Sequence, residues 1–279
     1  MPKPRLSLQT TTLWEYPSQH YGNEEQGSSE YRGATPSYVI WNLLERYTKP
    51  KDLVIDPMCG SGTTMDVARD LGRRALGYDL QPQRSDIFRA DARHLPLEDG
   101  KADFVFVDPP YGDNLKYSGQ ENCIGELPAT DPAYFEAMDM VFQEIDRVLR
   151  PDRYLAIYVC DIWKRNAFVP LGVHLSAMLM SRFLPVDHVT VVRGNKDLDK
   201  GNYHKAAEES NFFLRGYNHL LIFKKPSEEQ AREARREEER EQQAPRAQKP
   251  AKSKDRNAGS RPRRKKPNRS GSTTRRPRP

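Results

Sequence analysis

Short apolar runs alternate with stretches of helical periodicity through most of the chain. Runs of apolar and β-branched residues that end at glycine, proline or aspartate are typical of buried strands. They predict strands at residues 53–55, 75–78, 86–90, 103–107, 154–159, 186–192 and 220–223. Apolar positions three and four residues apart predict helices at residues 35–47, 64–71, 131–149 and 169–183. This alternation favours an α/β fold with a doubly wound, mostly parallel seven-stranded sheet.

The same patterns divide the chain into four parts. Residues 1–33 are polar and aromatic, and we expect an N-terminal arm that is ordered where its aromatic residues dock. We expect a folded domain over residues 34–226, which begins with a helix for which Thr35 is a typical cap. Acidic and basic residues alternate over residues 227–243, which predicts a solvated helix. Proline, arginine, lysine and serine dominate residues 244–279, which predicts a disordered basic tail.

Two loops at the carboxyl ends of predicted strands carry the candidate chemistry. The first, residues 56–64, reads Asp-Pro-Met-Cys-Gly-Ser-Gly-Thr-Thr, and the second, residues 108–111, reads Asp-Pro-Pro-Tyr. Ligands of open α/β sheets bind outside the carboxyl ends of the strands. We therefore expect the two loops to line one site.

The loop at residues 108–111 suits an exocyclic amino group on a nucleobase. Such a nitrogen is a poor nucleophile because its lone pair is delocalised into the ring. The Asp108 carboxylate and the Pro109 carbonyl can accept the amino hydrogens and localise that pair, while Pro110 helps to keep the turn stiff. Tyr111 offers a ring on which an extruded base can stack. Taken alone, this tetrapeptide is as typical of a rigid strand-end turn.

The glycine loop predicts a cofactor site. Gly60 and Gly62 permit a close backbone approach at a strand-to-helix turn. Thr63-Thr64 replaces the third glycine of the dinucleotide fingerprint, so pyrophosphate binding is not favoured.

Three carboxylates complete this cofactor interpretation. Asp79 comes 23 residues after Asp56, close to the spacing that places a carboxylate on ribose hydroxyls. Asp91 ends the third predicted strand, where it can accept from an adenine amino group. Asp56 either binds the charged amino end of a cofactor or caps the following helix, and for the other two the alternative is a strand-end turn. An adenosine-bearing cofactor with a cationic centre and no pyrophosphate fits this set, namely S-adenosylmethionine.

The formal net charge of +6 comes wholly from the C-terminal end of the chain. From Ser227 onward 18 Lys and Arg face 8 Asp and Glu, which leaves 27 basic and 31 acidic residues before it. A basic chain would ordinarily indicate a nucleic-acid-binding fold. Because the body is slightly acidic, it has to bind nucleic acid through local patches.

Other compositional features limit the class of protein. Cys59, Cys123 and Cys160 are too scattered for a metal site or a disulfide framework, so we expect no metal and a reducing, cytoplasmic setting. No run approaches the roughly 20 apolar residues of a membrane span, and the N-terminus lacks the apolar core of a secretory signal.

The loop at residues 56–64, the segment 71–79 that follows it and the loop at residues 108–111 together resemble the N-4/N-6 amino-methyltransferases of DNA. The resemblance runs from about residue 14 to residue 225. It implies a Rossmann-like methyltransferase fold, S-adenosylmethionine as cofactor, and methyl transfer to an exocyclic amino group in DNA with base flipping. Aspartate as the first catalytic residue favours adenine N6 over cytosine N4.

The resemblance also implies roles for individual residues. The segment at residues 31–36 stands in the place of the family's additional cofactor-contacting motif. The implied cofactor contacts are Thr35, Asp56, Met58, Gly60, Gly62, Thr63, Asp79 and Asp91, and the implied catalytic residues are Asp108, Pro109, Pro110 and Tyr111. The long insertion that usually reads DNA sequence is missing, which leaves residues 112–130 and 193–217 as candidates.

Other functions stay open. Guanine-N2 methyltransferases of transfer RNA look similar through Asp-Pro-Pro-Tyr-Gly, which Gly112 completes, but usually carry an RNA-binding domain ahead of the catalytic one. C5-cytosine chemistry usually needs a Pro-Cys pair, and no cysteine here follows proline. A dehydrogenase would leave residues 108–111 unexplained. A non-catalytic nucleic-acid-binding protein that acts through its basic tail would be distinguished by its failure to bind the cofactor.

Overall fold

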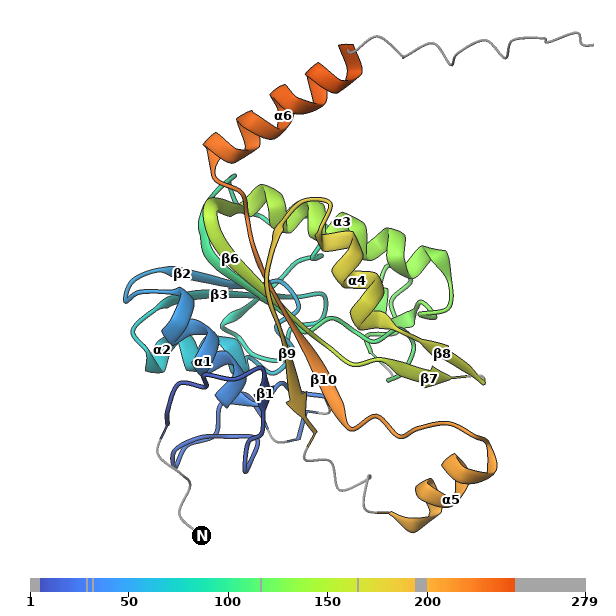
Figure 1. Cartoon of the computed structure of the whole chain (residues 1–279). Helices are drawn as coiled ribbons and strands as arrows, with labels where there is room; N and C mark the ends of the chain where they lie inside the picture. Colours follow the sequence, from blue (N-terminus) through green and yellow to red (C-terminus); the bar gives the residue numbers. More distant parts are fainter. Residues whose placement is uncertain are drawn as a thin grey trace, which may run out of the picture. The chain divides into compact units, whose positions relative to one another are not determined.

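The computed structural model describes residues 6–28, 30–31, 33–115, 117–164, 166–193 and 200–243. Its central sheet has eight strands in the order β1-β9-β10-β6-β5-β2-β3-β4 (Figure 1). These strands are β1 Leu13–Trp14, β2 Leu53–Asp56, β3 Arg74–Asp79, β4 Ile87–Arg89, β5 Ala102–Val107, β6 Leu149–Val159, β9 Leu184–Val192 and β10 Tyr217–Lys224. Strand β10 is antiparallel to β6 and β9, and the other pairs are parallel. The predicted α/β fold with a mostly parallel sheet is therefore confirmed.

Helices cover both faces of this sheet (Figure 1). The helices are α1 Ser37–Tyr47, α2 Thr63–Asp70, α3 Pro132–Val148, α4 Leu171–Leu179, α5 Gly201–Glu209 and α6 Glu228–Gln243, and a short 3-10 turn covers Ile124–Glu126. Side chains of β5 alternate between the faces: Phe104 packs with the core under α1 and α2, and Val105 packs with the core under α3 and α4. Because β5 is buried throughout, the sheet is covered on both sides, as expected of a doubly wound fold.

The predicted count of seven strands was wrong, because β1 adds an eighth at the edge of the sheet. Leu13 and Trp14 pair in parallel with Thr190 and Val191 of β9. Trp14 is buried, and its indole nitrogen donates to the carbonyl oxygen of Thr11 at 2.7 Å. Two residues are too short to show strand periodicity, so only the aromatic residue itself signalled this contact.

A hairpin between β6 and α4 also departs from the sequence interpretation. Strands β7 Ile162–Lys164 and β8 Ala167–Val169 pair antiparallel, with Asn166 at φ +59° in the turn. The predicted helix at residues 169–183 is therefore shorter, because Val169 belongs to β8 and the helix begins at Leu171. A three-residue strand gives almost no alternation from which to predict it.

The N-terminal arm packs on α1 through aromatic side chains. Tyr16 stacks on Tyr38 with ring centroids 4.9 Å apart, and Tyr21 meets the same ring edge-on at 6.0 Å. The Tyr21 hydroxyl donates to Asp70 Oδ2 of α2 at 2.7 Å. The arm is thus attached to α1, which precedes the first candidate loop, and to α2, which follows it.

The C-terminal part of the described chain is α6, which spans the residues over which acidic and basic side chains alternate. The chain divides into two compact units, Met1–Arg236 and Glu237–Pro279. The predicted basic tail, residues 244–279, lies outside the described residues. Within the described residues, none of the helices has the length and apolar character needed to cross a membrane.

Candidate cofactor and base site

The two loops singled out in the sequence line one pocket of about 860 Å³ at the carboxyl ends of β2, β3 and β5. A pocket of this size is in the range that holds a cofactor together with part of a substrate. Of the predicted site residues, those that line it are Thr35, Asp56, Met58, Gly60, Thr63, Asp79, Asp91, Asp108, Pro109, Pro110 and Tyr111. Gly62 is not among the lining residues.

The two glycines of the first loop have positive φ angles but different surroundings. Gly60 has φ +51°, and its amide nitrogen donates to Asp79 Oδ2 at 3.0 Å. A Cβ on Gly60 would lie 2.9 Å from the ring of Tyr31, so the arm reaches over this residue. Gly62, at φ +87°, is the N-cap of α2, and a Cβ there would lie 2.4 Å from Arg84. Gly62 therefore permits the turn, whereas Gly60 faces the pocket.

Asp56 is buried and holds the first loop together. Its Oδ2 accepts from the Thr64 hydroxyl at 2.6 Å, and its Oδ1 accepts from the Met58 amide at 3.1 Å. Burial raises the pKa of this carboxyl to about 7, although both hydrogen bonds lower it. Helix α2 has no side-chain cap, so Asp56 contacts this helix through the Thr64 hydroxyl without capping it, and its position on the pocket wall suits a cationic ligand.

Asp79 and Asp91 lie on the pocket wall with different partners. Asp79 accepts from two backbone amides, those of Gly60 at 3.0 Å and Gln81 at 2.8 Å. Asp91 forms a two-pronged pair with the Arg93 guanidinium, with the closest contact at 2.6 Å. Burial opposes charge on Asp91, but the hydrogen bonds and charge of Arg93 lower the pKa of this carboxyl overall. Asp79 is therefore the more available acceptor for a ligand hydroxyl.

Asp108 is held by two hydroxyl groups. The Thr35 hydroxyl donates to Oδ2 at 2.5 Å, and the Tyr111 hydroxyl donates to Oδ1 at 2.9 Å. Burial raises the pKa of Asp108 to about 7, against the lowering effect of both hydrogen bonds. This carboxyl group has a fixed orientation and keeps further acceptor lone pairs for a ligand in the pocket.

Thr35 has a different local role from the one the sequence predicts. Helix α1 begins at Ser37 with Pro36 as N-cap and no side-chain cap, so Thr35 does not cap it. Its hydroxyl instead reaches Asp108, which is 73 residues further along the chain. Helix-capping patterns are local, and they gave no signal for this long-range contact.

The backbone of the second loop is fixed by residues that the sequence interpretation missed. The hydroxyl of Tyr134, a buried residue of α3, donates to the Pro110 carbonyl oxygen at 2.7 Å. Gly112 follows with φ +61°, and a Cβ there would lie 2.5 Å from the Ala129 nitrogen. From the sequence, Tyr134 is only one of the apolar positions of the helix predicted at residues 131–149. The Pro110 carbonyl is thus committed to α3, which leaves the Pro109 carbonyl as the candidate acceptor.

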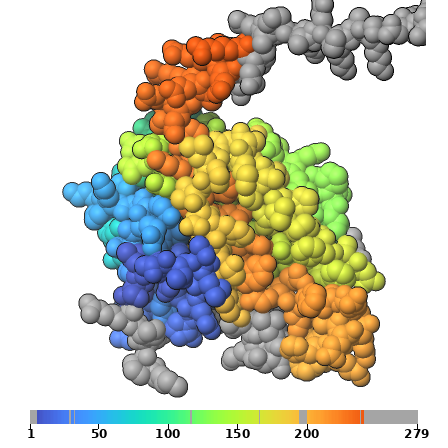
Figure 2. Space-filling view, in the orientation of Figure 1, coloured from blue at the N-terminus to red at the C-terminus, as the bar shows by residue number. Residues whose placement is uncertain are grey.

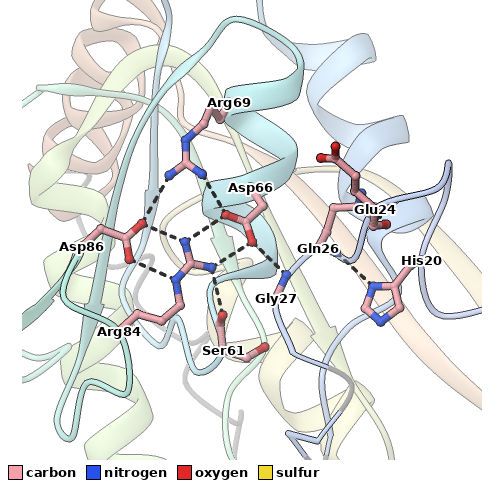
Figure 3. A network of polar contacts seen from close by, with 9 residues as sticks. All are labelled: His20, Glu24, Gln26, Gly27, Ser61, Asp66, Arg69, Arg84 and Asp86. Atoms are coloured by element: carbon pink, nitrogen blue, oxygen red, sulfur yellow. Dashed lines mark hydrogen bonds and ion pairs between the residues drawn. The ribbon is translucent and has the colours of Figure 1, made fainter.

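A charged network behind the first loop holds that loop in place (Figure 3). The Arg84 guanidinium makes a two-pronged pair with Asp66 at 2.8 and 2.9 Å and a second with Asp86 at 3.0 and 2.7 Å. It also donates to the Ser61 carbonyl oxygen at 3.1 Å. In the sequence these charges are indistinguishable from an ordinary solvated surface.

The same network holds the N-terminal arm against the first loop (Figure 3). The Gly27 amide donates to Asp66 Oδ2 at 2.9 Å. A Cβ on Gly27 would lie 2.4 Å from Thr63 Oγ1 and 2.7 Å from Ser61 Oγ, so the arm touches the loop without a gap. The arm, α2 and the segment after β3 therefore converge on the glycine loop.

The raised pKa values of Asp56 and Asp108 predict a pH dependence of stability. The unfolded chain titrates its aspartates near pH 4, so between about pH 4 and pH 7 the folded protein binds protons that the unfolded chain has lost. The contribution of these two groups to stability is therefore present below that window and is lost as the pH rises through about 7. Urea unfolding between pH 5 and pH 8 measures it. Asp108→Asn, which cannot ionise, should weaken the fall in stability, and an unchanged pH profile would contradict the raised pKa of Asp108.

The part of the chain that matches a known family includes the first loop, residues 56–64. Residues 4–90 match the family described as DNA methylase, N6_N4_Mtase. The type II methyltransferase M.HinfI of Haemophilus influenzae is 29% identical over 72 residues, covering 26% of this chain and 20% of the relative. The type II methyltransferase M2.DpnII of Streptococcus pneumoniae is 35% identical over 65 residues, covering 23% of this chain and 24% of the relative. A tRNA (guanine(10)-N2)-dimethyltransferase of Methanothermobacter thermautotrophicus is 29% identical over 89 residues, covering 26% of each chain.

Solved structures give broader but weaker similarity. A SAM-dependent methyltransferase from Methanosarcina mazei has a TM-score of 0.45 at 15% identity, and the match covers 67% of this chain and 98% of that one. A geranyl diphosphate methyltransferase in complex with SAM has a TM-score of 0.46 at 16% identity, and the match covers 68% of this chain and 85% of that one. The chain spans only a fifth to a quarter of the length of the curated relatives given above. Within residues 4–90, which hold the arm and the glycine loop, the predicted relation to the N-4/N-6 amino-methyltransferases of DNA is confirmed.

Proposed function

We propose that this chain transfers a methyl group from S-adenosylmethionine to the exocyclic amino group of a base in DNA, with adenine N6 favoured over cytosine N4. One observation carries the proposal. Asp108, oriented by two hydroxyl groups, lies in the same pocket as the glycine loop and Asp79. The DNA methylase family that matches residues 4–90 supports it.

The charge of the pocket fits a cationic cofactor. Asp56 and Asp108 are both pocket residues with pKa values raised to about 7 by burial, and the charge of Asp56 raises the pKa of Asp108 further. A positive charge between them would favour the ionised form of both groups. When bound, S-adenosylmethionine supplies a methyl group on a cationic sulfur. Asp79 would hold the ribose hydroxyls, and the loop around Gly60 would hold the methionine part.

The second loop would prepare the base for methylation. Asp108 and the Pro109 carbonyl accept the two hydrogens of the amino group, which keeps the nitrogen lone pair out of the ring and directed at the methyl carbon. The new nitrogen–carbon bond would form as the sulfur–carbon bond breaks, the rest of the cofactor would leave as a neutral thioether, and the proton lost by the nitrogen would pass to the Asp108 carboxylate. Thr35 and Tyr111 keep the Asp108 oxygens from turning away. Aligned donors and acceptors of this kind lower the barrier because they need no reorganisation during the reaction.

An RNA base is the second candidate substrate. Gly112 completes the string Asp-Pro-Pro-Tyr-Gly, and its positive φ and close approach to Ala129 make glycine necessary there. One relative of this chain is a tRNA (guanine(10)-N2)-dimethyltransferase. This alternative keeps the same cofactor and the same role for Asp108.

Mass spectrometry of nucleosides tests the proposal. The protein and methyl-labelled S-adenosylmethionine are incubated with duplex DNA, single-stranded DNA or transfer RNA, and the polymer is then digested. Labelled N6-methyl-2′-deoxyadenosine from the DNA samples, absent with Asp108→Ala, is the expected result. Label only in N4-methylcytosine changes the base, label only in RNA selects the second candidate, and no label in any polymer despite cofactor binding contradicts both.

The basic tail should supply much of the non-specific affinity for nucleic acid. Residues 244–279 carry dense Lys and Arg, whereas the body is slightly acidic. A protein that ends at Gln243 should methylate saturating substrate at a normal rate, bind it more weakly, and show a shallower slope of log affinity against log salt. A second protein that ends at Lys225 separates the contribution of α6. Equal affinities and salt slopes for all three proteins would show that the tail does not contact phosphates.

A further inference from the structure

A second surface of interest lies outside the pocket, on the hairpin β7–β8 and on the residues that precede β10. Trp163 of β7 stacks on Phe212 with ring centroids 5.5 Å apart and planes 10° from parallel. The Arg215 guanidinium lies over the Phe168 ring of β8 at 5.2 Å. The two segments lie next to each other on one face of the molecule (Figure 2). We define the aromatic platform as the side chains of Trp163, Phe168, Phe212, Phe213, Arg215 and Tyr217.

Several rings of the aromatic platform face solvent. Phe213 is 84% exposed, Phe168 48% and Tyr217 44%. Large exposed aromatic side chains gathered in one place mark an interaction surface. Helix α5 leads into this segment, and none of its residues is buried. This helix therefore contributes no residue to the core of the described chain.

The aromatic platform begins beside the catalytic loop. The hairpin follows β6, the neighbour of β5 in the sheet, and Asp108 directly follows the last residue of β5. Lys164 of β7 pairs with Asp113 at 2.7 Å, two residues after Tyr111. At the base of the hairpin, Asp161 accepts from the Gly172 amide at 2.9 Å and contacts His219 of β10 at 3.0 Å. These contacts hold the platform in a fixed place relative to the pocket.

The charges on the two segments distinguish them from the rest of the body. Residues 162–169 and 211–217 contain three basic residues, Lys164, Arg165 and Arg215, and no acidic residue. Asp113 pairs with Lys164, and Asp161 lies beside Arg215 at the base of the hairpin. The chain before Ser227 has more acidic than basic residues. Rings next to cations match a polynucleotide strand, in which flat bases alternate with phosphates.

We propose that the aromatic platform binds unpaired nucleotides that flank the target base, with their bases stacked on its rings and their phosphates near Arg215. The proposal rests on the function proposed above, because it assigns a role to a surface beside that pocket. It predicts tighter binding to a single strand, or to a duplex with a bubble around the target, than to an intact duplex. The shared chemistry is that of a single-stranded polynucleotide, DNA or RNA.

Fluorescence anisotropy of the full-length protein with labelled 12-nucleotide DNA, RNA and duplex DNA tests the proposal. Phe213→Ala and Phe168→Ala remove exposed rings without opening the core. Each should raise the Kd for the single strand about 5- to 150-fold, the effect of one lost base stack. Met180→Ala, at the C-cap of α4 and 57% exposed, is the matched control and should leave Kd unchanged. A larger effect with DNA or with RNA identifies which strand the platform binds.

Two results would overturn the proposal. Unchanged Kd values for every polynucleotide in both variants would exclude base stacking on these rings. A change of sedimentation coefficient in the variants, with unchanged nucleic-acid affinity, would show that the platform is a contact between copies of this chain. The anisotropy assay measures affinity without methyl transfer, so it remains valid even if the methylation assay fails. Normal methylation together with unaltered Kd values would contradict the proposal for the aromatic platform and leave the proposed methyl transfer standing.

Discussion

Asp108→Ala is expected to lower kcat for methyl transfer by at least about 100-fold while the Kd for S-adenosylmethionine changes little. Removal of one prearranged electrostatic partner typically costs about two to three orders of magnitude in rate. In the proposed mechanism Asp108 is such a partner, because the Thr35 and Tyr111 hydroxyls hold its two oxygens in place. Single-turnover kinetics with labelled cofactor, beside calorimetric titration of the cofactor, measure the two quantities.

Two further variants sharpen this test. Asp108→Asn keeps the shape of the side chain but replaces one acceptor oxygen by a donor, so it should be nearly as slow as alanine. Thr35→Val removes only the hydroxyl that donates to Asp108, so its kcat should fall less and its pH profile should shift. Near-normal turnover by Asp108→Ala would mean that the second loop is not the catalytic loop.

The second large effect concerns the cofactor. Asp79→Ala should raise the Kd for S-adenosylmethionine about 10- to 150-fold, since charge-assisted hydrogen bonds contribute roughly 1.5–3 kcal/mol. Asp79 also accepts from the amides of Gly60 and Gln81, so the loop itself loses two anchors. Isothermal titration calorimetry measures Kd, and thermal melting without cofactor measures stability.

A structural role for Asp79 would give a different result. In that case Asp79→Ala would melt at a much lower temperature without cofactor, and Asp79→Asn would restore stability. If Asp79→Asn melts normally but binds cofactor as weakly as alanine, the charge itself holds the ligand. Unchanged Kd in both variants would remove Asp79 from the site.

The sequence was sufficient to predict the elements whose signal is local. Apolar runs such as residues 103–107 marked the buried strands, and the two loops at strand ends were found because their residue types are unusual in combination. The carboxyl ends of parallel strands share one edge of a sheet, so their meeting in one pocket followed from the fold class.

Features that depend on distant partners could not be predicted in the same way. The hydrogen bond from Thr35 to Asp108 joins residues 73 positions apart. Arg84 holds the glycine loop only because the segment after β3, α2 and the arm meet there. Strand β1 and the hairpin β7–β8 have two or three residues per strand, too few for periodicity to appear. Local patterns therefore predicted the two loops that line the pocket. The side chains that hold these loops in place depend on tertiary packing and were not predicted.

The contacts of the N-terminal arm have a consequence for the energetics of the site. The arm pairs with β9 at Leu13 and places Gly27 on Asp66, and Thr35, two residues after the arm, contacts Asp108. Local opening of such a segment costs less free energy than global unfolding and exposes everything that it covers. Release of the arm together with Thr35 would break the contact behind the glycine loop and the hydrogen bond on the Asp108 carboxyl in one event. The two halves of the site therefore share a single free energy of opening, and a ligand that holds the arm closed stabilises both.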